Sequence, residues 1–282
     1  MIDINKLYDD NYFKELAERC YKEDRNYPEN FSNWHNHILD FGKFEHAKVI
    51  SNQIFTLEEV EIMQQEDCIN KVDWNKIKQI LKPTLDKLNN TSLYSIKNGC
   101  FSDKFKGNIC FSDKYDLCEK FWKLQYDSAM YDTGGYTELV VRELIPYNMY
   151  TTPLIYNGLP LRTELRVFYN LDTKQIEYVV DYWDYDYCYE HLDITDKIVF
   201  DWFHKQDNYT DNLIYITDYI YENINTLKFD KKLKGIWSID FMLVSDVDEF
   251  IDGIYLIDMA RGHRSAYWDP SKIRSEINEE QK

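Results

Sequence analysis

The chain has 282 residues, a net charge of −17 and a sequence pI near 4.8. With 44% hydrophobic and 29% charged residues, it has the composition of a folded globular protein with one large or two modest domains. A nucleic-acid binder normally needs a basic face, so the acidic balance argues against nucleic acid as the main partner. Without a membrane-length apolar run, a signal-peptide pattern or a C-x-x-C pair, we expect a cytoplasmic protein with free thiols and no membrane partner.

Residues 1–91 are expected to be mainly helical. Apolar spacing predicts a first helix from Asn5 to Lys22, followed by an irregular stretch over residues 29–55. Thr56–Glu59 reads as a capping box that opens a second helix. A third helix is predicted from Asp73 to Leu88, with Pro83 inside it.

Strands are predicted to begin after residue 91. Tyr94–Lys97 is a short strand that ends at an Asn-Gly turn. The polar segment Cys100–Lys114 includes Lys104 and could cover the phosphates of a nucleotide, although the usual P-loop pattern is missing. A helix is expected from Asp113 to Met130, and a strand from Thr137 to Ile145.

A second pair of strands follows, over Leu161–Tyr169 and Ile176–Tyr182. Glu164 and Arg166 share one face of the first of them. They are either a surface ion pair or part of a phosphate site, since the planar guanidinium suits phosphate. The acidic and aromatic residues 181–187 either hold an amine-bearing substrate or form a solvated loop, and we favour the loop. A helix is expected over residues 212–227, and a charged tail at the end.

Two apolar strands, residues 236–244 and 254–260, each carry one central aspartate, Asp240 and Asp258. In a hairpin folded symmetrically about Glu249, these two residues lie directly opposite each other. Cross-strand Cβ atoms are about 5 Å apart, so the carboxylates would repel unless a cation lay between them. Mg²⁺ bound with a nucleotide is one interpretation. The other is that both side chains reach solvent at the strand ends.

The order of these segments resembles the ATP-grasp superfamily, and within it the Cdc123-like branch. The resemblance covers residues 92–268, and the segments that carry it are Ser95–Lys97, Val140–Ile145, Thr163–Phe168, Ser238–Phe241 and Leu256–Met259. It implies an α+β fold in which a helical N-terminal region precedes two subdomains whose antiparallel sheets clamp a nucleotide. The expected boundaries are 1–91, 92–145 for the small subdomain, 146–268 for the large subdomain, and 269–282 for the tail.

The resemblance also implies roles for individual residues. Lys97 would bind the α- and β-phosphates of ATP, with the loop that carries Lys104 closing over them. Backbone groups of the adenine segment would read the base, and these residues are Arg142, Glu143, Leu144 and Ile145. Arg166 would reach the γ-phosphate, while Asp240 and Asp258 would hold Mg²⁺.

The last metal motif departs from the family pattern of acid-x-Asn, because Ala260 stands at the asparagine position. Arg261 or His263 could take its place, so Arg166 and Arg261 are the candidate catalytic residues. The leading hypothesis is an ATP- and Mg²⁺-dependent ligase that joins a carboxylate to an amine, on a small molecule, peptide or protein, through an acyl phosphate. The alternatives are an ATP-binding assembly factor for a protein partner, as in the Cdc123-like branch, and a binding protein without a nucleotide.

Overall fold

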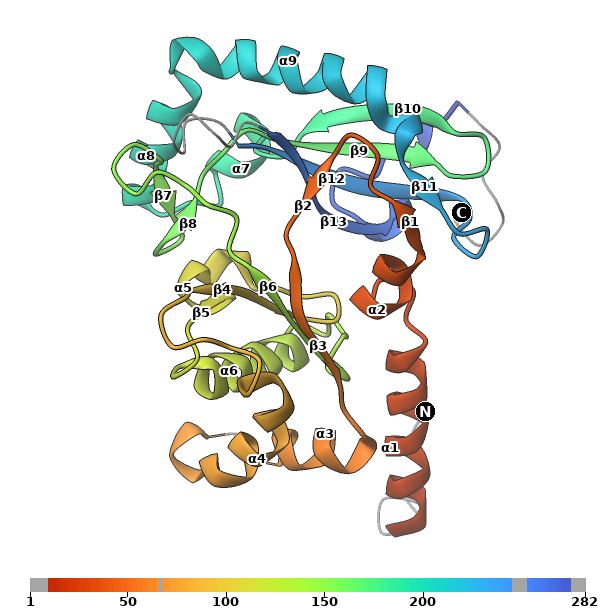
Figure 1. Ribbon diagram of the computed structural model, residues 1–282, viewed down its shortest axis with the longest axis vertical. Coiled ribbons are helices and arrows are strands. Elements are labelled where there is room, and N and C mark those ends of the chain that lie inside the picture. Colours follow the sequence, from red (N-terminus) through yellow and green to blue (C-terminus); the bar gives the residue numbers. More distant parts are fainter. Residues whose placement is uncertain (1–9, 66–67, 245–252, 275–282) are drawn as a thin grey trace. The chain divides into compact units, whose positions relative to one another are not determined.

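The computed structural model describes residues 10–65, 68–244 and 253–274 and has an α+β fold with mainly antiparallel sheets, as the sequence predicts (Figure 1). The chain divides into two compact units. Unit 1 consists of Met1–Asn33, Val49–Asp103 and Ile109–Glu143. Unit 2 consists of Trp34–Lys48, Lys104–Asn108 and Leu144–Lys282, so both units draw on early parts of the chain.

Unit 1 is built on a four-stranded antiparallel sheet in the order β3-β6-β4-β5. Its strands are β3 (Val49–Ile54), β4 (Tyr94–Asn98), β5 (Phe111–Ser112) and β6 (Glu138–Glu143). Alternating residues of β4 and β6, among them Ile96, Leu139 and Val141, point to one face and are buried. Helices cover that face and close the core of the unit (Figure 1).

The helices at this end of the sequence are α1 (Asp10–Arg25), α2 (Phe31–Trp34), α3 (Leu57–Gln64), α4 (Trp74–Leu85), α5 (Gly107–Cys110) and α6 (Leu117–Met130). The capping box is confirmed, because Thr56 accepts from the Glu59 amide and the Glu59 side chain accepts from Thr56. Helix α4 contains Pro83 as predicted. The capping and the apolar spacing explain why these helices could be located from the sequence.

Unit 2 is built on a five-stranded sheet in the order β10-β9-β12-β13-β2. Its strands are β2 (Glu45–His46), β9 (Glu164–Asn170), β10 (Gln175–Asp181), β12 (Ile236–Val244) and β13 (Gly253–Arg261). All neighbours are antiparallel except β13 and β2, which are parallel. Two small antiparallel pairs complete the unit, β1 (Ile38–Asp40) with β11 (Lys228–Phe229), and β7 (Leu154–Ile155) with β8 (Leu159–Pro160).

The helices of unit 2 are α7 (Tyr185–Tyr189), α8 (Ile194–His204) and α9 (Asp207–Asn223). Helix α9 packs along the sheet against β9 and β10 (Figure 1). Its residues Ile216 and Ile220 are fully buried there. The face of the sheet that points towards α9 is therefore mainly apolar, with Asp181 of β10 at its edge accepting from the Tyr209 hydroxyl of α9.

Two expectations from the sequence are wrong. Residues 29–55 are not irregular, because they contain β1, β2 and β3, and these short strands pair with β11, β13 and β6. Residues 181–187 are not one solvated loop, since α7 begins at Tyr185 and Trp183 is buried. In both places the structure depends on partners far away in the chain, which local patterns do not report.

None of the described helices is both long and apolar enough to cross a membrane. All six cysteines are free, as the absence of a C-x-x-C pair led us to expect.

Glu138 of unit 1 is fully buried, and burial raises the pKa of its carboxyl above the usual value. Its Oε1 accepts from the Ser32 amide, while its Oε2 has no hydrogen-bond partner among residues 10–65, 68–244 and 253–274. A raised carboxyl pKa in the folded state means that folding favours the protonated form. The contribution of Glu138 to stability is therefore greatest below its ordinary pKa of 4.5 and is lost as pH rises through the folded-state pKa.

We expect the Glu138→Gln variant to gain stability relative to the wild type as pH rises. Glutamine keeps an acceptor for the Ser32 amide but cannot ionise, so the penalty of burying a charge disappears. Urea denaturation between pH 4.5 and 8, with hydrogen exchange of the β6 amides as the readout, measures the difference in unfolding free energy between the variant and the wild type. A difference in unfolding free energy that is constant over this range would contradict the prediction.

Candidate functional site

Charged side chains gather on the face of the unit 2 sheet that points away from α9. Side chains alternate along a strand, so Glu164 and Arg166 lie on the face opposite Leu165 and Val167, as predicted. Asp240 of β12 pairs with Arg166 of β9 and therefore shares its face. The charges come from neighbouring strands, which brings cations and carboxylates within reach of one another.

The predicted register of the β12–β13 hairpin is confirmed, because Asp240 lies directly opposite Asp258. A bulge follows Asp240 and shifts the pairing by one residue, so that Phe241 pairs with Leu256. Asp240 is buried and Asp258 is half-buried. The centre of the connecting loop, including Glu249, lies outside the described residues.

Asp240 forms a bidentate ion pair with Arg166. Arg166 Nε donates to Asp240 Oδ1 over 2.7 Å, and Nη2 donates to Oδ2 over 2.8 Å. Burial alone would lower the pKa of the guanidinium, but the paired carboxylate and the nearby Asp258 hold it above its ordinary value. The structure therefore compensates the buried Asp240 charge with a protein cation.

Lys104 brings a second cation to this face from a separate segment of unit 2. Its Nζ lies 3.8 Å from Glu164 Oε2 and donates to the Tyr182 hydroxyl over 2.9 Å. The Tyr182 ring lies beneath both cations, 4.2 Å from Lys104 Nζ and 4.8 Å from Arg166 Cζ. Tyr182 therefore connects the two ion pairs, although its segment gave no sign of this in the sequence.

The electrostatics of Lys104 and Glu164 follow from their burial. Burial by itself would lower the pKa of Lys104, but the Tyr182 hydroxyl that accepts its hydrogen bond and the Glu164 and Asp240 carboxylates outweigh that effect and raise it. Burial raises the pKa of the Glu164 carboxyl, and Lys104 only partly opposes the change. In the part of the chain that the structure describes, Glu164 Oε2 also has no hydrogen-bond partner. This carboxyl is therefore poised to accept a proton or a ligand donor.

Arg162 is a further cation that the sequence reasoning missed. Its Nη2 donates to the Ile145 carbonyl over 3.0 Å, and its guanidinium stacks on the Tyr147 ring. Within the described residues its Nε and Nη1 are buried without a hydrogen-bond partner, and burial lowers the pKa of the guanidinium. The spacing Arg162-x-Glu164-x-Arg166 was the available signal, because residues two apart share a strand face.

Three of the proposed nucleotide-binding residues lie in unit 1. Lys97 on β4 is almost fully buried and shares its face with Arg142 on β6, which also stacks on the Phe31 ring. Glu143 pairs with Tyr94 on the opposite face and is exposed. The roles of these three side chains in nucleotide binding stay predictions.

The other predicted residues belong to unit 2. Leu144 and Ile145 follow β6 where pairing stops, and the Ile145 carbonyl is already engaged by Arg162. Arg261 pairs with Trp237 and therefore lies on the face opposite Asp258. The structure does not bring Arg261 to the charged face, so we no longer consider it a catalytic candidate.

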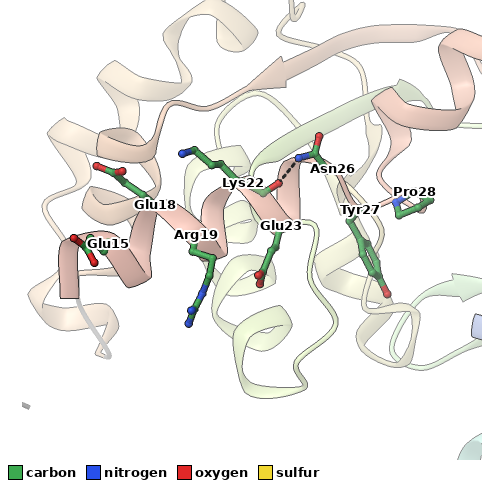
Figure 2. Close-up of a pocket in the computed structure, with 8 residues that line it drawn as sticks. All are labelled: Glu15, Glu18, Arg19, Lys22, Glu23, Asn26, Tyr27 and Pro28. Carbon is green, nitrogen blue, oxygen red and sulfur yellow. Dashed lines mark hydrogen bonds between the residues drawn. The ribbon is translucent and has the colours of Figure 1, made fainter. Parts of the chain in front are cut away.

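A separate hollow lies along α1 in unit 1, and Figure 2 shows the side chains that line it. It is open and lined by side chains of a single helix and the turn after it, namely Glu15, Glu18, Arg19, Lys22, Glu23, Asn26, Tyr27 and Pro28. The one hydrogen bond drawn there joins the Asn26 amide to the Lys22 carbonyl. Side chains of both charge signs line this surface, so its charge does not indicate which class of ligand would bind there.

A scan against protein-family models, a search of curated proteins and a search of solved structures each found no match for the chain. Within the described residues, no group of three or more His, Cys, Asp or Glu side chains is arranged to hold a metal ion. The function must therefore be argued from the charged face itself.

Proposed function

We propose that the chain binds ATP with Mg²⁺ at the charged face of unit 2 and uses it as a carboxylate–amine ligase. The observation that carries this proposal is Arg162, whose buried Nε and Nη1 have no acceptor among the described residues and which interacts electrostatically with Glu164, the partner of Lys104. Buried donors without partners cost stability, so a ligand rich in acceptor oxygens fits them. Phosphate is such a group, and arginine and lysine are its usual protein partners.

The donor set also fits a hard divalent cation. Mg²⁺ is usually held by one or two carboxylates together with phosphate oxygens and water, so it does not need three protein ligands. Asp240 and Asp258 are opposite each other, and each Asp240 oxygen bonded to Arg166 retains a second lone pair. These two residues would hold Mg²⁺, which offsets charge on a transferring phosphoryl group.

In the proposed reaction, a substrate carboxylate oxygen attacks the γ-phosphorus, the bond to the bridging oxygen breaks and ADP leaves. An amine then forms a bond to the acyl carbon, loses a proton and displaces inorganic phosphate. Lys104, Arg162 and Arg166 would bind and orient the phosphates, which is the main protein contribution to phosphoryl transfer. Glu164, whose carboxyl pKa is raised by burial, would accept the proton that the amine loses.

We expect MgATP to stabilise the wild type by about 2.7 kcal/mol at a hundredfold excess over the dissociation constant. The shift should require Mg²⁺ and should disappear in Asp258→Asn, which removes one metal ligand without breaking the Arg166 pair. Asp186→Asn makes the same charge change at an exposed site of unit 2 and should keep the shift. Thermal unfolding with ATP, ATP plus EDTA, and Mg²⁺ alone provides the measurement.

No shift with any nucleotide would leave the third hypothesis, a binding protein without a nucleotide site. If Asp258→Asn keeps the shift, the β12–β13 hairpin does not hold the metal. If Lys97 binds the phosphates, Lys97→Met should lose the MgATP shift in the same assay, whereas Lys78→Met, at an exposed site of unit 1, should keep it.

A second candidate function is an ATP-binding assembly factor for a protein partner. The observation in its favour is Ala260, which lies on the same face as Asp258 and offers no ligand where the ATP-grasp pattern has asparagine. Release of ADP separates the two functions. A ligase releases ADP when a carboxylate substrate is present and turns over repeatedly once an amine is added, whereas an assembly factor binds MgATP tightly with little turnover.

A further inference from the structure

The outer face of α9 carries acidic and large apolar side chains side by side. Its members recur three or four residues apart, which places them on one side of the helix, and they are Asp211, Ile214, Tyr215, Asp218, Tyr221 and Glu222. Ile214 is 55% exposed, and Tyr215 and Tyr221 are each 56% exposed. We call these six residues the α9 outer face.

The fold of unit 2 does not require this face. The buried residues Ile216 and Ile220 attach α9 to the sheet from its opposite side (Figure 1). Apolar side chains that stay exposed to water do not contribute to the stability of the fold. Contiguous exposed apolar groups commonly mark interaction surfaces. Tyr221 and Leu213 also line a hollow between α9 and β10, whose lining includes the charged residues Glu177, Asp181 and Arg274.

The charges of α9 have one sign. Its 17 residues include four acidic and no basic side chains. In the described part of the chain, Asp211, Asp218 and Glu222 have neither an ion-pair nor a hydrogen-bond partner. Like charges one turn apart destabilise a helix slightly, so the chain keeps these carboxylates at a small cost.

Helix α8 offers a useful contrast. It exposes a row of apolar residues, Ile194, Ile198 and Trp202. Its neighbouring charges have both signs, and Asp201 is already paired with Lys205. That surface therefore does not specify the charge of an occupant, whereas the α9 outer face does.

We propose that the α9 outer face docks a basic amphipathic helix of a protein partner. Arginine or lysine side chains of the partner would pair with the three carboxylates, and its apolar side chains would pack on Ile214, Tyr215 and Tyr221. A second copy of this chain is a poor occupant, because two such faces would repel each other. The proposal is independent of nucleotide binding at the charged face of the sheet.

The test uses the full chain and a synthetic helical peptide that has leucines along one side and arginines beside them. A scrambled peptide of the same composition controls for charge alone. Binding is measured by fluorescence anisotropy at low and physiological salt. We expect the designed peptide to bind, the scrambled peptide to bind more weakly, and salt to weaken both.

The triple variant Asp211→Asn/Asp218→Asn/Glu222→Gln should weaken binding by about tenfold, because three exposed charge pairs are lost. Tyr215→Ser/Tyr221→Ser should also weaken it. The matched control, Glu58→Gln/Glu61→Gln/Asp116→Asn, removes the same charge from exposed sites of unit 1 and should leave affinity within about twofold.

Equal weakening by the two triple variants would show that the peptide responds only to net charge and would overturn the proposal. So would equal binding of the scrambled peptide, or no binding of either peptide. Dimerisation of the wild type that the α9 triple variant abolishes would assign the face to a second copy and would likewise overturn it.

Discussion

Replacing Asp240 with asparagine is expected to lower the free energy of unfolding of unit 2 by about 3 to 5 kcal/mol. The variant leaves the Arg166 guanidinium largely buried without its carboxylate, and the new amide group directs N–H donors at other donors. Urea denaturation with hydrogen exchange of the β12 amides as the readout measures the loss of stability in unit 2, which contains the Arg166–Asp240 pair.

Two controls separate this charge effect from a general loss of contacts. Asp40→Asn breaks the exposed Lys228–Asp40 pair of the same unit and should cost less than about 1 kcal/mol. The double variant Arg166→Met/Asp240→Leu removes both charges and should recover most of the stability lost in Asp240→Asn. A double variant no more stable than Asp240→Asn would contradict the assignment of the cost to an uncompensated charge.

The corresponding change in unit 1, Asp24→Ala, is expected to cost about 3 to 5 kcal/mol. Asp24 is buried, its Oδ1 accepts from the Gly135 amide, and its Oδ2 accepts from both the amide and the hydroxyl of Thr137. The variant leaves three buried donors without an acceptor, and such donors lose solvation with no compensation. Hydrogen exchange of the β6 amides measures the effect.

Asp73→Ala is the matched control for Asp24→Ala. Asp73 accepts from two amides at the exposed start of α4, where water can replace it, so its loss should cost about 1 kcal/mol. Equal costs for the two variants would show that the buried Asp24 network adds nothing beyond an ordinary helix cap.

Much of the fold could be predicted because its signals are local. The strands β9, β10, β12 and β13 show apolar alternation or runs bounded by turn residues, and Thr56 begins α3 with a capping box. The strands β1 to β3 were missed, since two to six residues carry too little periodicity. Their positions are set by distant strands, as when β2 pairs with β13.

The sequence also predicted only part of the candidate site. Asp240 and Asp258 were placed opposite each other from their numbering, because a symmetric hairpin fixes that pairing and the bulge lies just beyond it. The ion pair between Asp240 and Arg166 was not predicted, since it depends on which strand lies beside β12. The same limit applies to Tyr182 and to Arg162, whose partners come from other segments. Arg261 illustrates the opposite error, because its nearness to Asp258 in sequence hides that it lies on the other face.

The interleaved units have a consequence for synthesis on the ribosome. The chain passes from one unit to the other five times, after residues 33, 48, 103, 108 and 143. Unit 1 has all its residues once Glu143 is made, so it can fold while the rest of the chain is still being translated. Strand β2 must wait for β13, which is made more than two hundred residues later. Unit 2 is therefore the late and slow part of folding, and Lys104 cannot find its partners before Glu164 and Tyr182 have been made.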